Sequence, residues 1–208
     1  MAELDLRREL VRAGRELYRQ GMLAGAGGNL SARLPDGGVL ITPSGLAKGR
    51  LRPADLLVLD LDGRGAGKPS SETPLHLAIY RRFPWVGAVV HAHPVNATAL
   101  AVMHRSIPVE TLPEGLVALG AIPCVPYVPP AGPALGEAVA PALDEGDGAL
   151  LLNHGAVTIG RTVAEAQAKM EVLEALAAVA LKAPQAVPLP AAEVERLRAI
   201  WRSRRATF

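Results

Sequence analysis

Apolar positions along this chain of 208 residues repeat with two different spacings. Spacing near the helical period predicts helices at 4–18, 74–82, 94–104 and 191–204, and in the segment that follows Thr162. Short apolar runs bounded by turn residues predict strands at 39–42, 56–60, 86–93, 150–153 and 156–159. Because strands and helices are interspersed, the pattern predicts an α/β fold with helices covering a sheet of undetermined strand order.

Local signals mark the ends of several predicted helices. Gly21 is a stop signal after the first helix, and Pro74 suits the first turn of the second. Thr162 and Glu165 have the spacing of a capping box at the start of a long helix, which Pro184 ends.

Composition is that of an ordinary globular protein and predicts one domain over residues 1–208. Half of the residues are apolar and 20% are charged, while the formal net charge is only +2. This weak excess does not favour a nucleic-acid partner. One basic cluster near the C-terminus is interpreted as a solvated helix face: Arg196, Arg198, Arg202, Arg204 and Arg205.

Cys124 is the only cysteine, so no internal disulfide can form, which fits a reducing compartment. It lies in the apolar run 122–128 and is predicted to be a buried structural thiol. No apolar stretch has the length of a membrane span, and the first residues lack the apolar core of a signal peptide. We therefore expect a cytoplasmic protein with no membrane partner.

The histidines carry the strongest chemical signal in the chain. His91 and His93 flank Ala92 on a predicted strand, so both imidazoles point to the same face. His154 follows another predicted strand and can be a third ligand if the two strand ends are neighbours. This spacing fits a catalytic zinc site with three protein ligands, and it equally fits hydrogen-bonded histidines. His76 and His104 lie in predicted helices, where we interpret them as ordinary surface or core residues.

A polar segment precedes the helix predicted at 74–82. Ser70 and Ser71 lie where free backbone N–H groups and the positive end of the helix dipole attract anions. Such a segment can bind phosphate, or it can be an ordinary N-cap formed by Ser71 or Thr73. Glu72 lies at the same edge and can reach a metal or a substrate C–H bond.

Two further segments have the composition of ligand-binding loops. Gly27 and Gly28 permit close backbone approach to a ligand, and Asn29 adds a donor. Ser44 and Gly45 form a second loop of this kind. Each signal is weak alone, because ordinary turns have the same composition.

These motifs, in this order, resemble the class II aldolase/adducin-head family over nearly the whole chain. The matching segments are Gly28-Asn29-Leu30-Ser31, Ile41-Thr42-Pro43-Ser44-Gly45, Gly67-Lys68-Pro69-Ser70-Ser71-Glu72, Val89-Val90-His91-Ala92-His93 and Asn153-His154-Gly155. Residues 105–108 and 122–127 also resemble aldolases of this family. The resemblance implies a three-layer α/β/α fold with a largely antiparallel central sheet.

The resemblance also implies roles for individual residues. His91, His93 and His154 would bind Zn²⁺, and Glu72 would be a fourth ligand in the resting enzyme and the proton-transferring catalytic group. The substrate phosphate would be held by Gly28, Asn29, Ser44, Gly45, Ser70 and Ser71. The family's aldolases are cyclic tetramers, so a homotetramer with active sites between subunits is expected.

The activity that follows from the resemblance is aldol cleavage of a ketose 1-phosphate. L-fuculose 1-phosphate would give dihydroxyacetone phosphate and L-lactaldehyde through an enediolate whose charge the metal stabilises. Two positions depart from the family's aldolases. Leu112 stands where a tyrosine faces the aldehyde, and a second tyrosine near the family's C-terminus has no counterpart in residues 205–208. The proton donor and the aldehyde specificity therefore stay open.

Two alternatives remain at this point. Relatives that dehydrate methylthioribulose 1-phosphate, epimerise pentulose phosphates or decarboxylate their substrate use the same metal and phosphate motifs. A non-catalytic adducin-type head domain is the second alternative, and the complete set of candidate ligands argues against it.

Overall fold

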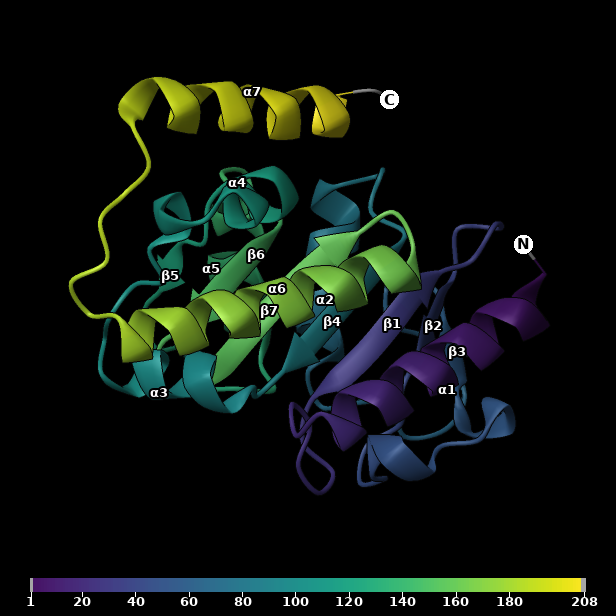
Figure 1. Cartoon of the computed structure of the whole chain (residues 1–208). Coiled ribbons are helices and arrows are strands. Elements are labelled where there is room, and N and C mark those ends of the chain that lie inside the picture. Colours follow the sequence, from purple (N-terminus) through teal and green to yellow (C-terminus); the bar gives the residue numbers. More distant parts are fainter. Residues whose placement is uncertain (1, 207–208) are drawn as a thin grey trace.

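A seven-stranded sheet forms the centre of the computed structural model, which describes residues 2–206 (Figure 1). Its strand order is β3-β2-β1-β4-β7-β6-β5. The strands are β1 Asn29–Arg33, β2 Val39–Ile41, β3 Leu57–Leu59, β4 Ala88–Ala92, β5 Cys124–Val125, β6 Gly148–Leu151 and β7 Gly155–Gly160. All neighbouring pairs are antiparallel except β5 and β6, which are parallel. The predicted α/β class and the largely antiparallel sheet are confirmed.

Helices cover both faces of this sheet. Figure 1 shows α1, α3 and α6 in front of the strands and α2 and α5 behind them. The helices are α1 Glu3–Arg19, α2 Thr73–Arg82, α3 Val95–Val102, α4 Pro113–Leu119, α5 Pro133–Ala142, α6 Val163–Lys182 and α7 Ala191–Ala206. Three short 3-10 helices are η1 Lys48–Arg50, η2 Pro53–Asp55 and η3 Val109–Thr111.

Alternation along the strands divides the core into two layers. In β4, Val89 packs into the cluster that contains α2 and α5, and Val90 packs into the larger cluster beneath α1, α3 and α6. Successive side chains of a strand point to opposite faces, so a strand covered on both faces is buried throughout. Every residue of β4 is buried. This places His91 on the same face as Val89, toward α2.

The sequence pattern identified the long elements and missed several short ones. The helix predicted at 94–104 ends earlier, at Val102, and β4 ends at Ala92 rather than at His93. The unpredicted elements are β1, β5, α4 and α5. β1 alternates polar and apolar residues from Asn29 to Arg33, but it directly follows a glycine-rich segment whose composition favours a loop.

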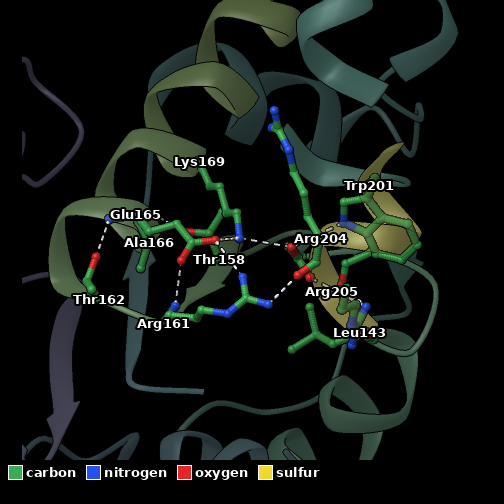
Figure 2. Close-up of polar contacts among 12 residues, drawn as sticks. Leu143, Thr158, Arg161, Thr162, Glu165, Ala166, Lys169, Trp201, Arg204 and Arg205 are labelled. Atoms are coloured by element: carbon green, nitrogen blue, oxygen red, sulfur yellow. Dashed lines mark hydrogen bonds and ion pairs between the residues drawn. The ribbon is translucent and has the colours of Figure 1, made fainter. Parts of the chain in front are cut away.

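α7 follows a proline-containing connection and is attached to the body by a buried ion-pair cluster (Figure 2). Asp147 lies at its centre and is only 4% exposed. Lys169 of α6 donates a hydrogen bond to Asp147 Oδ2 at 2.8 Å, and Trp201 Nε1 of α7 donates to the same oxygen at 3.1 Å. Arg205 adds an ion pair at 3.4 Å to Asp147 Oδ1.

The interpretation of the C-terminal arginines as a solvated face is wrong for two of them. Arg205 is packed over the rings of Phe83, Trp85 and Trp201 and donates a hydrogen bond to the Leu143 carbonyl at 2.7 Å. Arg198 is partly buried and pairs with Glu110 at 2.6 Å. The helix repeat places these two side chains toward the body, while Arg196, Arg202 and Arg204 are exposed.

Cys124 corrects a second expectation, because it is exposed rather than buried. It lies on β5, an edge strand that pairs with β6 alone. Val125 points into the core from this strand, so alternation directs the neighbouring Cys124 outward. Within residues 2–206, no helix combines the length and the apolar composition that crossing a bilayer requires.

Candidate metal centre and ligand-binding loops

Three histidines meet where β4 ends and the chain turns from β6 into β7. His91 is the fourth residue of β4, and His93 directly follows the strand. His154 lies in the tight turn that connects β6 to β7, where Asn153 adopts a φ of +56°. Because β4 and β7 are paired neighbours, the turn brings His154 beside the end of β4.

The imidazole nitrogens converge on one point. The Nε2 atoms of His91 and His93 are 3.1 Å apart, and one ligand nitrogen from each of the three histidines lies within 4.8 Å of the others. Glu72 completes the group, with its carboxylate 3.1 Å from His91 Nε2 and 3.2 Å from His154 Nε2. The structure thus brings together all four residues that the sequence suggested as metal ligands.

The orientation of the His91 ring suits the binding of a cation. Its Nδ1 lies 2.9 Å from the backbone carbonyl oxygen of Ala156, which can only accept a hydrogen bond. With Nδ1 bonded to this carbonyl, Nε2 is the ring nitrogen that faces Glu72 and His93. Such an imidazole, oriented by a carbonyl on its far side, is the usual form of a histidine metal ligand.

His93 is also held in the ligand form. Burial, together with the charges of His91 and His154, lowers the pKa of His93 to about 4. The ring is therefore neutral at neutral pH, which is the state that binds a metal. Three imidazoles and one carboxylate are nitrogen and oxygen donors of the kind that bind a divalent metal ion.

Glu72 occupies the N-cap position of α2 and is 7% exposed. Burial is the largest influence on the pKa of Glu72 and raises it, but hydrogen bonds from His154, His91 and Asn29 and the charge of His91 outweigh burial. The pKa is consequently well below its ordinary value, and the carboxylate is ionised. The N-terminus of α2 adds a favourable dipole.

A chain of buried hydrogen bonds extends behind this carboxylate. Asn29 Nδ2 donates to Glu72 Oε2 at 2.7 Å, so Asn29 Oδ1 accepts the bond from His76 Nε2. His76 Nδ1 then accepts from the Ser31 hydroxyl at 2.6 Å, and Ser31 accepts from the Tyr80 hydroxyl at 2.8 Å. Every donor in this chain points toward Glu72.

His76 was expected to be an ordinary surface or core residue, but its contacts place it in the chain of hydrogen bonds behind Glu72. It is fully buried, and burial, aided by the charge of His91, lowers the pKa of His76 to about 3. The neutral ring therefore keeps one donor and one acceptor, as the chain of hydrogen bonds requires. Its spacing on α2 marks a core position and carries no signal of this contact.

The three loops suggested for phosphate binding lie side by side. Leu30 N donates to Thr42 Oγ1, Ser44 N donates to the Lys68 carbonyl, and Ser70 N donates to the Thr42 carbonyl. Gly28 has a φ of +66°, and a Cβ there would lie 2.8 Å from the His91 carbonyl oxygen. This residue must be glycine because the loop passes so close to β4.

Ser71 is the member of these loops best placed for a ligand. It is exposed at the start of α2, and its hydroxyl makes no hydrogen bond with any residue in 2–206. The helix has no side-chain N-cap bond, and the Thr73 hydroxyl donates to the Ser70 carbonyl instead. The ordinary capping alternative for Ser71 is therefore not what the structure contains.

Comparisons with known proteins agree with this geometry. The family described as Class II Aldolase and Adducin N-terminal domain matches residues 8–181. The chain is 36% identical to the 3-oxo-tetronate 4-phosphate decarboxylase of Haemophilus influenzae, over 84% of this chain and 86% of that protein. It is 39% identical to the L-fuculose phosphate aldolase of Methanococcus vannielii, over 84% and 94%.

Among solved structures, YgbL of Escherichia coli superimposes with a TM-score of 0.89 and 34% identity, covering 94% of this chain and 99% of that chain. The chain belongs to the class II aldolase and adducin N-terminal domain family. Class II aldolases are metal-dependent, and the group of His91, His93 and His154 could hold a metal ion. The resemblance drawn from the motifs is confirmed.

Proposed function

We propose that the protein is a zinc-dependent lyase of small phosphorylated sugars that breaks the C–C bond next to a carbonyl. The observation that carries this proposal is the convergence of Glu72 with His91, His93 and His154 at the loops that contain Asn29 and Ser71. Retro-aldol cleavage of L-fuculose 1-phosphate, or a similar ketose 1-phosphate, is the first candidate reaction. Relatives named as L-fuculose phosphate aldolases support it.

Each side chain has a distinct task in this reaction. A bound zinc ion would polarise the substrate carbonyl and stabilise the negative charge that develops on its oxygen. Cleavage between C3 and C4 releases the proton of the C4 hydroxyl to solvent, releases L-lactaldehyde and leaves an enediolate. Glu72 takes up a proton from solvent and transfers it to C3, which gives dihydroxyacetone phosphate. Asn29 holds the Glu72 carboxylate in place through its 2.7 Å hydrogen bond.

Decarboxylation of 3-oxo-tetronate 4-phosphate is the second candidate, because a relative of this name is 36% identical. Loss of carbon dioxide from this β-keto acid breaks the C1–C2 bond and gives the same enediolate of dihydroxyacetone phosphate. Glu72 would protonate it in the same way. The reaction needs no group that exchanges a proton with an aldehyde oxygen.

Leu112 is the specific feature that favours this second candidate. It joins η3 to α4, and its side chain packs against the larger hydrophobic cluster. An aliphatic side chain cannot replace the family's tyrosine as a proton donor. Decarboxylation is unaffected by this loss, whereas a missing general acid would slow aldol cleavage by roughly 10²–10⁴-fold.

One assay separates the two reactions. The purified protein is incubated with L-fuculose 1-phosphate and, separately, with 3-oxo-tetronate 4-phosphate, and dihydroxyacetone phosphate is measured together with L-lactaldehyde or carbon dioxide. Dihydroxyacetone phosphate with equimolar L-lactaldehyde identifies the aldolase. Carbon dioxide from the second substrate alone identifies the decarboxylase, and no product from either substrate contradicts the proposal.

Assembly is the remaining part of the proposal. We propose a homotetramer with active sites between subunits, as expected from the family's aldolases. Support comes from large apolar side chains exposed on the single chain, which include Val95, Val102 and Tyr127. Sedimentation should give the mass of four chains, and a monomer with full activity would contradict this assembly.

A further inference from the structure

Lys48 is a buried cation that neither the sequence motifs nor the proposed reaction explains. It begins the 3-10 helix η1 and is only 2% exposed. Its Nζ donates hydrogen bonds to the carbonyl oxygens of Ala26, at 2.6 Å, and Leu46, at 3.1 Å. Within residues 2–206, no carboxylate forms an ion pair with it.

Such an arrangement has an energetic cost that needs a reason. A buried ammonium group loses its hydration, and buried lysines are normally paired with a carboxylate. Two carbonyl groups satisfy hydrogen bonds but carry no compensating net charge. Lys169 shows the usual arrangement elsewhere in the same protein, because its Nζ lies 2.8 Å from Asp147 Oδ2. Lys48 has no carboxylate in direct contact among residues 2–206, and its two partners are carbonyl groups.

The position of this charge indicates its purpose. Ala26 belongs to the glycine-rich loop, whose next residue, Gly27, lies so close to His93 that a Cβ there would be 3.2 Å from Nδ1. Leu46 directly follows Ser44 and Gly45, the second loop suggested for phosphate binding. The ammonium group therefore joins two of the three loops beside the metal centre.

The electrostatics extend to the carboxylate at that centre. Burial lowers the pKa of Lys48, and the charge of Glu72 raises it. Hydrogen bonds donated to two carbonyl groups also favour the ammonium form. A divalent cation with Glu72 and Lys48 would carry a net charge that a phosphate monoester dianion balances.

We infer that Lys48 is the buried cation of the phosphate subsite, a positioning residue that holds two loops together and balances the negative charge of the substrate's phosphate. This inference rests on the proposed phosphorylated substrate, and it holds for either candidate reaction. It requires no direct contact between Lys48 and the substrate, because charge acts through the loops at low local dielectric.

Lys48→Met tests the inference, with Arg50→Met as its matched control. Arg50 is an exposed cation in the same 3-10 helix, so its loss removes an equal charge from the surface. Calorimetry measures binding of inorganic phosphate, dihydroxyacetone phosphate and unphosphorylated dihydroxyacetone to the metal-analysed proteins. We expect Lys48→Met to weaken both phosphates by at least about tenfold and dihydroxyacetone by less than twofold. Arg50→Met should bind all three like the wild type.

Three outcomes would overturn the inference. The first is a Lys48→Met variant with the phosphate affinity of the wild type. The second is a variant that loses dihydroxyacetone and metal binding equally with phosphate binding, because Lys48 would then be only a structural clamp. Absence of phosphate binding by the wild type overturns it too. If the lyase assay gives no product but phosphate binding depends on Lys48, the proposed reaction is wrong and the inference about Lys48 still holds. Failure of the proposed function and failure of this inference are therefore distinguishable.

Discussion

Glu72 and Asp147 are two equally inaccessible carboxylates with opposite surroundings. They are 7% and 4% exposed. Asp147 is paired with Lys169 and Arg205 and accepts a hydrogen bond from the Trp201 indole. Within residues 2–206, the side-chain partners of the Glu72 carboxylate are the imidazoles of His91 and His154 and the amide of Asn29.

The difference separates a structural charge from a functional one. At Asp147 the cations belong to the chain, so the cluster is complete and attaches α7 to α6. At Glu72 the neighbours are imidazole and amide groups, and the carboxylate and the imidazoles together offer ligand atoms to a metal ion from solution. A buried carboxylate whose partners are imidazoles rather than lysine or arginine is therefore the better indicator of a metal site.

The largest expected effect is on chemistry at Glu72. Glu72→Gln should reduce exchange of the C3 proton of dihydroxyacetone phosphate with solvent by about 10²–10⁴-fold, because an amide cannot accept that proton. Exchange is followed by NMR in D₂O, with circular dichroism as the control for folding. Exchange near the wild-type rate would show that Glu72 is not the proton-transferring group.

The matching change at the other carboxylate should affect stability instead. Asp147→Asn leaves Lys169 and Arg205 without their shared counter-charge, and we expect a loss of about 3 kcal/mol in the free energy of unfolding. Urea denaturation measures this loss. Metal content per chain should stay at the wild-type value, and a variant that keeps its stability but loses metal would reverse the comparison.

Acid should lower the free energy of unfolding through protonation of His76 in the unfolded chain. Its pKa is about 3 in the folded chain and near 6.5 when unfolded, so only the unfolded chain binds a proton between these values. Stability is thus fully present above pH 6.5 and falls as pH decreases toward 3, by at most about 1.4 kcal/mol per pH unit.

Comparison with His76→Gln isolates this contribution, because His93 titrates in the same direction in both proteins. Unfolding of the metal-free proteins is measured in urea between pH 7 and 5. The wild type should lose stability more steeply than the variant. Parallel profiles would mean that His76 is not held neutral.

The smallest effect is expected at the start of α6. The Thr162 hydroxyl accepts a hydrogen bond from Glu165 N at 3.1 Å, and Thr162→Ala should cost about 1 kcal/mol. Metal content and C3 proton exchange should not change. Any loss of metal here would show that general destabilisation, rather than local chemistry, empties the metal centre.

Local sequence signals predicted much of the candidate site. Alternation on a strand placed His91 and His93 on one face, and the serines before α2 marked a helix start beside Glu72. The predicted capping box is half present. Thr162 accepts from Glu165 N, but the Glu165 side chain accepts from Arg161 N rather than from Thr162 N.

Pairing between distant segments explains what the sequence did not predict. β1 pairs with β4 so that Asn29 lies opposite His91, and nothing in either segment specifies this partner. His76 has the spacing of a core residue, and Lys48 has the type of a surface residue. Their significance comes from neighbours far away in sequence, Asn29 for one and Ala26 for the other.

The one-directional chain from Tyr80 to Glu72 has an evolutionary consequence. Each member uses a donor toward the carboxylate and an acceptor away from it, so a single replacement by a residue of different polarity breaks the sequence of bonds. Relatives should therefore retain Ser31, His76 and Tyr80 together or replace them together. Substitutions at these three positions should therefore covary among relatives.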